Sequence, residues 1–279
     1  MNAIEIKNLK KTYKDFSLKN INLNLEQGTV MGLIGENGAG KTTLIRSILK
    51  LTSYEGDIKI FGKDISKDLK DDIGVVMGDK FFTEKMKLKE IESIMESFYK
   101  NWDSQYFNLL VKKIEIPQTK PYKKLSTGNK MKVKIAIALS HKAKLLILDE
   151  PTSGLDPVVR DEILDIFFDF LKNKNVSILF SSHITSDLEK IADYVTYISN
   201  GEIVLSEAKD DLSFKYGLLR TSEDDVKKYD EKFFIKKRSN RCNIDILIES
   251  VNDFIKLYPN AIVERPSIED IMVILKRGE

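Results

Sequence analysis

The stretch that most constrains the fold of this chain is "GENGAGKTT", at residues 35–43. It fits the pattern G-x-x-x-x-G-K-[ST], with Gly35, Gly40, Lys41 and Thr42 at the fixed positions. The apolar run "TVMGLIG" leads into it, and the amphipathic run "KTTLIRSILK" follows. A phosphate-binding loop lies between a strand and a helix, whereas an incidental glycine-rich turn has no such setting. The sequence therefore predicts a P-loop within an α/β fold.

The residue types of this loop explain how it would hold a nucleotide. Glycines allow backbone N–H groups to turn inward around β-phosphate oxygens. Lys41 would place its charge on the β- and γ-phosphates, and the hydroxyl of Thr42 can ligate Mg²⁺.

A second acidic motif, "LLILDEP", predicts a buried strand that ends in Asp149 and Glu150. Taken alone, two carboxylates at a strand end are more often solvated charges. Downstream of a P-loop, we expect Asp149 to hold Mg²⁺ and Glu150 to polarise the attacking water.

Two further residues are candidates for contacts with the nucleotide. The predicted strand "VSILFSSH" brings His183 to the carboxyl edge of the sheet, which favours contact with the γ-phosphate over a purely structural histidine. No guanine-recognition motif of the form Asn/Thr-Lys-x-Asp occurs, so we expect adenine as the base. Tyr13, at the end of a predicted strand, can stack on that base or pack in the core, and stacking is preferred.

Composition excludes several classes of protein. The 279 residues include 45 Lys and Arg against 43 Asp and Glu, and a net charge of +2 gives no case for nucleic-acid binding by bulk charge. The one cysteine, Cys242, excludes an internal disulfide and a cysteine metal cluster. The apolar runs are far shorter than the ~20 residues that span a bilayer. We expect a soluble protein without a signal peptide and without a nucleic-acid partner.

The remaining pattern predicts the order of the elements. "AIEIKNL" and "NINLNLEQG" alternate as strands, "GDIKIFGKDI" is expected to form a hairpin, and residues 85–139 have a helical pattern. Later, "YVTYISNGEIVL" is expected to be a strand. After about residue 209 the pattern indicates a small appended α/β domain, whose helix "SIEDIMVILK" begins with a Ser267/Asp270 capping pair.

Five motifs in a fixed order resemble those of the nucleotide-binding subunits of ABC transporters. They are "GENGAGKTT", "KLSTGNKMK", "LLILDEP", "TSGLD" and "SSH", within residues 1–208. The resemblance implies a P-loop NTPase with a RecA-like core, an antiparallel β subdomain and an inserted helical subdomain at about residues 85–140. Residues 209–279 would form the small C-terminal α/β domain.

The resemblance also assigns roles to residues. It implies an ATPase that uses ATP and Mg²⁺, with Lys41, Glu150 and His183 as catalytic residues. Tyr13 would stack on adenine, and Thr42 and Asp149 would hold the metal. The implied Walker A residues are Gly35, Asn37, Gly38, Ala39, Gly40, Lys41, Thr42 and Thr43. The implied signature residues are Leu125, Ser126, Thr127, Gly128 and Asn129, and the implied D-loop residues are Ser153, Gly154, Leu155 and Asp156.

In this family two ATPase subunits dimerise head to tail. The signature helix of one subunit then points at the γ-phosphate on the Walker A loop of the other, and Asp156 is expected to make a contact across the interface. The partner would be a second ABC ATPase subunit, in either a homodimer or a heterodimer.

The chain departs from the family pattern at two places. The usual signature is Leu-Ser-Gly-Gly-Gln, and here Thr127 replaces the first glycine and Asn129 the glutamine. In the Q-loop, Gly78 stands where glutamine is usual and Asp79 follows it. Asp79 can serve as a metal ligand through a water, or it can be an ordinary surface aspartate.

The sequence is similar to the YtrB-like branch of ABC-2-type exporters, a style of sequence that includes ATPases of staphylococcal phenol-soluble modulin exporters. This implies an ATPase on the inner face of the cell membrane, bound to an ABC-2-type transmembrane permease. The export substrates it suggests are peptides or antimicrobial compounds. The alternative is a soluble ABC ATPase without a membrane partner.

Overall fold

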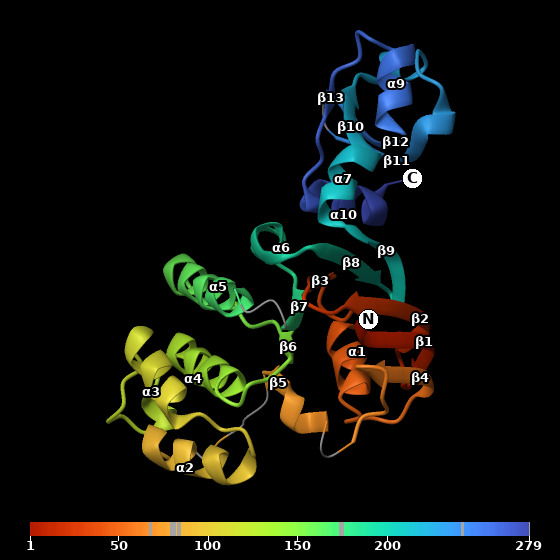
Figure 1. The fold of residues 1–279 in the computed structure, drawn as a ribbon. Coiled ribbons are helices and arrows are strands. Elements are labelled where there is room, and N and C mark those ends of the chain that lie inside the picture. Colours follow the sequence, from red (N-terminus) through yellow and green to blue (C-terminus); the bar gives the residue numbers. More distant parts are fainter. Residues whose placement is uncertain (67–68, 79–81, 83–84, 173–175, 241–242, 279) are drawn as a thin grey trace. The chain divides into compact units, whose positions relative to one another are not determined.

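The computed structural model describes residues 1–66, 69–78, 82, 85–172, 176–240 and 243–278 (Figure 1). Asp79 and Cys242 lie outside these described residues. The chain divides into two compact units, residues 1–206 and residues 207–279.

A six-stranded sheet forms the centre of the first unit, in the order β5-β6-β7-β3-β8-β9. β5, β6, β7, β3 and β8 pair in parallel. The bounds are Val30–Ile34 for β3, Ile73–Val76 for β5, Leu145–Asp149 for β6, Ser177–Ser182 for β7, Tyr194–Ser199 for β8 and Glu202–Ala208 for β9. Every residue of β3, β6 and β7 is buried. This explains the apolar runs of β3 and β6, whereas β7 also contains the buried serines Ser177, Ser181 and Ser182.

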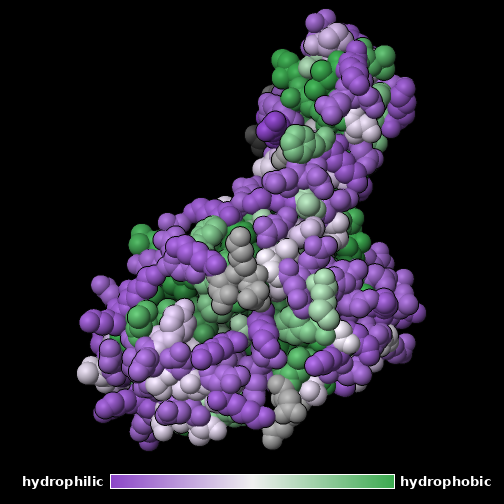
Figure 2. All heavy atoms as spheres, in the orientation of Figure 1, coloured by the Kyte–Doolittle hydropathy of each residue, from purple (hydrophilic) through white to green (hydrophobic). Residues whose placement is uncertain are grey.

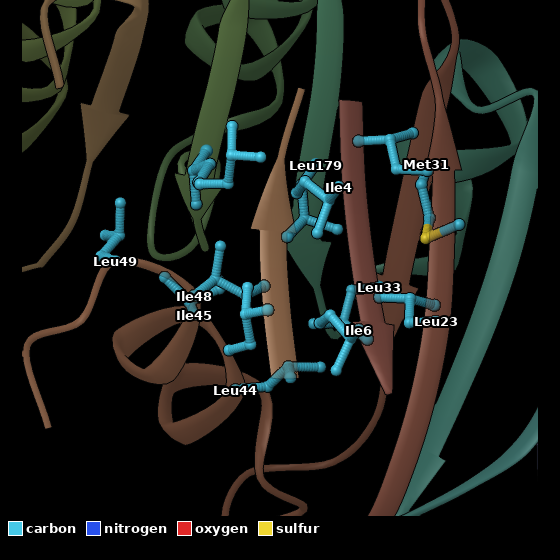
Figure 3. Packing of buried hydrophobic residues seen from close by; sticks show 14 of the residues in the cluster. Ile4, Ile6, Leu23, Met31, Leu33, Leu44, Ile45, Ile48, Leu49 and Leu179 are labelled. Carbon is cyan, nitrogen blue, oxygen red and sulfur yellow. The ribbon is translucent and has the colours of Figure 1, made fainter. Parts of the chain in front are cut away.

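A second, antiparallel sheet of three strands has the order β2-β1-β4. Its strands are β1 (Asn2–Thr12), β2 (Ser17–Glu26) and β4 (Glu55–Ile60). Helix α1 (Lys41–Ile48) packs its apolar side chains into the same core as this sheet and the central one, as Figure 3 shows for Leu44, Ile45 and Ile48. The first turn of α1 is thus anchored from the side that faces away from solvent.

Two predictions of local structure in this unit were wrong in detail. The expected hairpin at "GDIKIFGKDI" has only one strand, β4, which pairs with β1, and a single bridge joins Ile60 to Lys63. The expected single strand "YVTYISNGEIVL" is two strands, β8 and β9, joined by Asn200 and Gly201. Both turn residues have positive φ, 49° and 77°, as a two-residue hairpin turn requires.

Gly201 makes contacts that a hairpin turn usually lacks. Its N–H donates to the carbonyl oxygen of Ala39 in the P-loop at 3.0 Å, and its carbonyl oxygen accepts from the N–H of Lys19 on β2 at 2.8 Å. A Cβ atom at this position would lie 1.9 Å from the carbonyl oxygen of Ser17. The turn is therefore packed against the P-loop and β2, and only glycine fits there.

The helical part of the first unit contains α2 (Leu88–Phe98), α3 (Ser104–Lys113) and α4 (Thr127–Leu139), which gather on one side in Figure 1. Short 3₁₀ turns occur at Leu69–Asp72 and Tyr122–Lys124. Asp103 caps α3 and Ser126 caps α4 through side-chain hydrogen bonds. Helices α5 (Pro157–Leu171) and α6 (Thr185–Ile191) follow β6 and β7.

The second unit is a four-stranded antiparallel sheet, in the order β11-β12-β10-β13, with short helices. The strands are β10 (Tyr216–Thr221), β11 (Phe234–Ser239), β12 (Ile244–Glu249) and β13 (Val263–Glu264). The helices are α7 (Lys209–Lys215), α8 (Glu223–Val226), α9 (Val251–Leu257) and α10 (Ile268–Arg277), with a 3₁₀ turn at Glu231–Phe233. The capping pair predicted for α10 is confirmed, because Ser267 and Asp270 form a complete capping box.

Phe233 and Phe254 lie in the core of this second unit, with Ile246 and Ile248 from the sheet. Figure 2 shows hydrophobic residues at its surface among hydrophilic ones, and Ile255, Leu257 and Ile262 are exposed there. Among the residues that the structure describes, none of the helices has the length and apolarity needed to cross a membrane.

Candidate functional site

The loop predicted to bind phosphate joins β3 to α1, and two of its glycines lie where no other residue fits. A Cβ atom at Gly35 would lie 2.4 Å from the carbonyl oxygen of Ile198 on β8. Gly40 has a φ of 118°, and a Cβ atom there would lie 2.8 Å from the side chains of Phe16 and Leu18. The loop is thus tightly packed on its inner side, which fixes the start of α1, where unpaired backbone N–H groups attract anions.

Lys41 is the first residue of α1, and its ammonium group faces three oxygens although the residue is only 5% exposed. Nζ donates to the carbonyl oxygens of Gly35 at 2.5 Å and Glu36 at 3.2 Å. It also lies 3.0 Å from Oε1 of Glu150. This last contact is an ion pair without hydrogen-bond geometry, since Glu150 Oε1 is buried and has no hydrogen-bond partner. The P-loop lysine therefore contacts a carboxylate that follows β6.

Asp149, the last residue of β6, is held by two hydroxyl groups. Its Oδ2 accepts a hydrogen bond from Thr42 Oγ1 at 2.9 Å, and its Oδ1 accepts one from Ser181 Oγ at 2.8 Å. Thr42 lies on α1 and Ser181 on β7, so three elements meet at this carboxylate. The two predicted metal ligands are thus in direct contact.

The chemistry of these ligands fits Mg²⁺. A hydroxyl and a carboxylate are hard oxygen donors, and Mg²⁺ bound with a nucleotide takes one or two such protein ligands together with phosphate oxygens and waters. Thr42 is exposed, while Asp149 is buried. A metal held by both would lie at the mouth of the P-loop.

Glu150 and His183 form the most direct side-chain contact of the site. His183 Nδ1 and Glu150 Oε2 are 2.6 Å apart. A carboxylate has no proton to give, so His183 donates through Nδ1, which leaves Nε2 as the second polar atom of the ring. The side chain of His183 is 39% exposed, and that of Glu150 is 21% exposed. The sequence predicted a contact of His183 with phosphate, and the structure adds this contact with the carboxylate.

The backbone of Glu150 is in the left-handed region, with a φ of 51°, directly before Pro151. Such a conformation costs a residue other than glycine about 1–3 kcal/mol, and it persists only where surrounding contacts hold it. Here the N–H of Glu150 donates to Ser181 twice, to the carbonyl oxygen at 3.2 Å and to Oγ at 3.0 Å. The strained turn brings the carboxylate of Glu150 into contact with Lys41 and His183.

Tyr13 lies at the edge of the P-loop. A cavity of about 730 Å³ is lined by Tyr13, by loop residues including Gly38 and Lys41, and by Glu150. Tyr13 is 43% exposed, its hydroxyl lies 3.4 Å from Thr52 Oγ1, and the ammonium of Lys11 lies 4.8 Å from the centre of its ring. Tyr13 is thus a wall of the phosphate cavity and is not part of the core.

The signature residues form the exposed start of α4. Oγ of Ser126 accepts the N–H of Asn129 at 3.2 Å, so Ser126 is the N-cap, and Thr127 begins the helix. Ser126 and Thr127 are exposed and Leu125 is buried. A Cβ atom at Gly128 would lie 3.1 Å from the side chain of Val159 on α5, so this position is crowded.

The D-loop residues connect β6 to α5. Leu155 is buried, Gly154 is exposed with a φ of 69°, and Asp156 caps α5 by accepting the N–H of Val159 at 3.0 Å. Ser153 lines a cavity of about 470 Å³ together with Thr127, Glu150 and Gly78. The signature, the D-loop and the carboxylate after β6 therefore border one space.

Gly78, at the Q-loop position, follows β5, and a Cβ atom there would meet nothing within 4 Å. The preceding carbonyl oxygen, that of Met77, accepts a hydrogen bond from Lys134 Nζ on α4 at 2.7 Å. The predicted metal ligand Asp79 lies outside the described residues.

Sequence reasoning missed Ser181 and Lys134. Ser181 was within reach of a register argument, since it pairs with Asp149 across β6 and β7. The contact between Lys134 and Met77 left no signal in the sequence.

The chain is similar to a known family and to several known proteins. Residues 18–153 match the ABC transporter family. The chain is 32% identical over 202 residues to the ABC transporter ATP-binding protein YtrB of Bacillus subtilis, which covers 71% of this chain and 69% of that protein. It is 35% identical over 210 residues to the lantibiotic transport ATP-binding protein SrtF of Streptococcus pyogenes, covering 74% of this chain and 91% of that protein.

A solved structure of an ATP-binding subunit of an ABC transporter has a similar fold. It is 25% identical, with a TM-score of 0.67, and covers 75% of this chain and 91% of that one.

Proposed function

Because the chain belongs to the ATP-binding proteins of ABC transporters and is an ATPase, we propose that it powers an ABC-2-type membrane exporter from the cytoplasmic face. ATPases of this family bind ATP, form dimers and act with a transmembrane permease. Our proposal adds Mg²⁺ as the metal and an ABC-2-type permease as the partner. The second ATPase subunit is either a copy of this chain or a related protein.

The observation that carries the catalytic part is the contact of Glu150 with both His183 and Lys41, beside Asp149. His183 donates to one oxygen of Glu150, which orients the carboxylate. Glu150 takes a proton from a water as that water attacks the γ-phosphorus. The bond from the γ-phosphorus to the bridging oxygen breaks, and ADP leaves with the electron pair.

The charges around the phosphates complete this mechanism. Lys41 holds its charge at the mouth of the P-loop, where the start of α1 also favours anions. Thr42 and Asp149 would hold Mg²⁺, which neutralises charge that develops on the phosphate oxygens. In this proposal these side chains are what one subunit contributes to the reaction, and the signature helix of the other subunit completes the site.

The exposed start of α4 supports a dimer. Ser126 and Thr127 present the positive end of a 13-residue helix to solvent. In a head-to-tail dimer this end would face the γ-phosphate that the other subunit holds. The sequence-based role of Asp156 in that interface remains a proposal, because its carboxylate caps α5 in the same chain.

An apolar groove supports the permease contact. A cavity of about 610 Å³ lies beside β5 and the end of α2, and its apolar lining includes Leu49, Leu51, Met77, Phe98 and Tyr99. Leu51 is 60% exposed and Phe98 is 71% exposed, and both line this one groove. Exposed apolar side chains that gather in one patch are typical of an interaction site. The groove includes Met77 and the end of α2, and we propose that the permease docks there.

For the substrate, we propose peptides or antimicrobial compounds. The relative SrtF is named for lantibiotic transport. The likeness to phenol-soluble modulin exporters remains a prediction from the sequence. A soluble ATPase without a membrane partner is the alternative, and one experiment separates the two.

That experiment is affinity purification of the tagged chain from detergent-solubilised membranes. We expect a multi-span membrane protein to co-purify with the wild type, and much less of it with Phe98→Ser, which removes the exposed ring from the groove. The variant should keep its basal ATPase rate. Recovery of no membrane protein with the wild type would favour the soluble alternative.

The catalytic assignment is tested with Glu150→Gln. We expect this variant to bind ATP, to lose turnover and to accumulate as an ATP-bound dimer in size-exclusion chromatography. Undiminished hydrolysis by this variant would refute the role of Glu150.

A further inference from the structure

Ser181 is a buried hydroxyl that contacts both acidic residues of the site. The residue is 0% exposed and lies on β7, two residues before His183. Its Oγ donates to Asp149 Oδ1 at 2.8 Å and accepts the N–H of Glu150 at 3.0 Å. One atom therefore links the side chain of the first carboxylate to the backbone of the second.

The chemistry of this position requires a hydroxyl. The single proton of Oγ goes to Asp149, and a lone pair of the same oxygen receives the N–H of Glu150. Alanine can do neither. Replacing the serine would leave a buried N–H with only the longer bond to the carbonyl oxygen of residue 181, at 3.2 Å, and would leave Asp149 Oδ1 without this donor.

Each of the two bonds constrains a group in the proposed reaction. The bond to Oδ1 fixes the plane of the Asp149 carboxylate, so that Oδ2 stays at Thr42, on the side where the metal would bind. The bond to the N–H of Glu150 holds the left-handed turn, with its φ of 51°, that directs the Glu150 side chain toward His183 and Lys41. Loss of the hydroxyl releases both constraints together.

We propose that Ser181 is a positioning residue for ATP hydrolysis, whose hydroxyl sets the Asp149 carboxylate for the metal and the Glu150 carboxylate for the attacking water. The inference rests on the roles proposed above for Asp149 and Glu150. Ser181 itself touches neither nucleotide nor water in this scheme.

The test compares two buried serines of the same strand. Ser177, also 0% exposed, lies at the other end of β7 and accepts the N–H of Gly28 at 2.9 Å. Ser181→Ala and Ser177→Ala therefore each remove a buried hydroxyl from β7. Ser181→Thr keeps the hydroxyl at the site, and Glu150→Gln serves as the reference for lost hydrolysis.

Two readouts are measured for each variant. The first is kcat and KM for ATP. The second is the additional rise in Tm that Mg²⁺ produces in the presence of ATP. It is the Tm with ATP and Mg²⁺ minus the Tm with ATP and EDTA. This second readout reports the metal ligands without requiring turnover.

For Ser181→Ala we expect kcat to fall about 10- to 100-fold, the usual effect of removing a partner of a metal-ligating group. KM should change less than about threefold, and the Mg²⁺-dependent rise in Tm should shrink. Ser177→Ala should keep kcat within about twofold of the wild type and retain the full rise. Ser181→Thr should recover most of the lost kcat.

The inference fails if Ser181→Ala keeps the wild-type kcat while Glu150→Gln is inactive. It also fails if Ser177→Ala and Ser181→Ala lose kcat and the Mg²⁺-dependent rise equally, because both effects would then come from lost stability. If Ser181→Thr folds but does not recover kcat, the hydroxyl does not have the positioning role. If Glu150→Gln itself remains active, the error lies in the proposed function.

Discussion

Replacement of His183 tests which nitrogen of the ring matters. Nδ1 donates to Glu150 Oε2 at 2.6 Å. A hydrogen bond to a charged group stabilises the arrangement that it holds by about 1.5–3 kcal/mol. The side chain is 39% exposed, so water replaces part of the lost contact and the lower end of that range applies. About 1.5 kcal/mol corresponds to roughly a tenfold change in rate. We therefore expect His183→Ala to lower kcat about tenfold, with KM for ATP nearly unchanged.

Replacing His183 with asparagine or with glutamine distinguishes the contact with Glu150 from a contact with phosphate. The amide nitrogen of asparagine can occupy the place of Nδ1, and that of glutamine can occupy the place of Nε2. If the bond to Glu150 carries the effect, His183→Asn should recover part of the rate and His183→Gln should recover little. Steady-state ATPase assays at saturating Mg²⁺ provide the measurement. Recovery by glutamine alone would refute the reasoning and leave the phosphate contact as the role of this residue.

Three further changes give separate tests. Tyr13→Ala should raise KM for ATP about tenfold, since stacking of a base contributes about 1–3 kcal/mol, while Tyr13→Phe should have little effect because the hydroxyl contact with Thr52 is long, at 3.4 Å. Gly40→Ala should abolish ATP binding, measured by fluorescence. Gly62 also has a positive φ but lies in open space, so Gly62→Ala should lower the free energy of unfolding in urea by only about 1 kcal/mol. His141 follows α4 and is 0% exposed, and this burial lowers the pKa of its imidazole. The unfolded chain therefore binds the extra proton more readily, so the free energy of unfolding should fall as pH drops below about 6.5. His141→Phe should show a weaker dependence on pH.

The parts of the site that the sequence predicted are those fixed by short segments. The conformation of "GENGAGKTT" can be predicted from the segment itself, because close packing and backbone conformation require glycine at Gly35 and Gly40. The position of Asp149 follows from β6, since a buried run of five residues has to end where the chain reaches the edge of the sheet. The start of α4 is local as well, because the sequence predicts Ser126 or Thr127 as a helix cap, and Ser126 is the cap.

The parts that sequence reasoning missed depend mostly on which strands and helices become neighbours. Ser181 contacts Asp149 only because β7 pairs with β6 in one register. Lys134 reaches the carbonyl oxygen of Met77 because α4 packs beside β5, 57 residues away in the chain. The split of "YVTYISNGEIVL" into two strands had a local signal, Asn200–Gly201, which the apolar run on both sides obscured.

The turn at Gly201 has a practical consequence for protein engineering. Tips of hairpins are usually the permissive places for inserted tags, fluorescent proteins and new chain ends. This tip is closed to them, because its N–H is bonded to Ala39 in the P-loop and the space of a side chain is already taken by Ser17. A reporter inserted there would pull on the nucleotide loop. The turn at Gly62, exposed and with only Met1 within reach of a Cβ atom, is the safer place to label this subunit inside a working transporter.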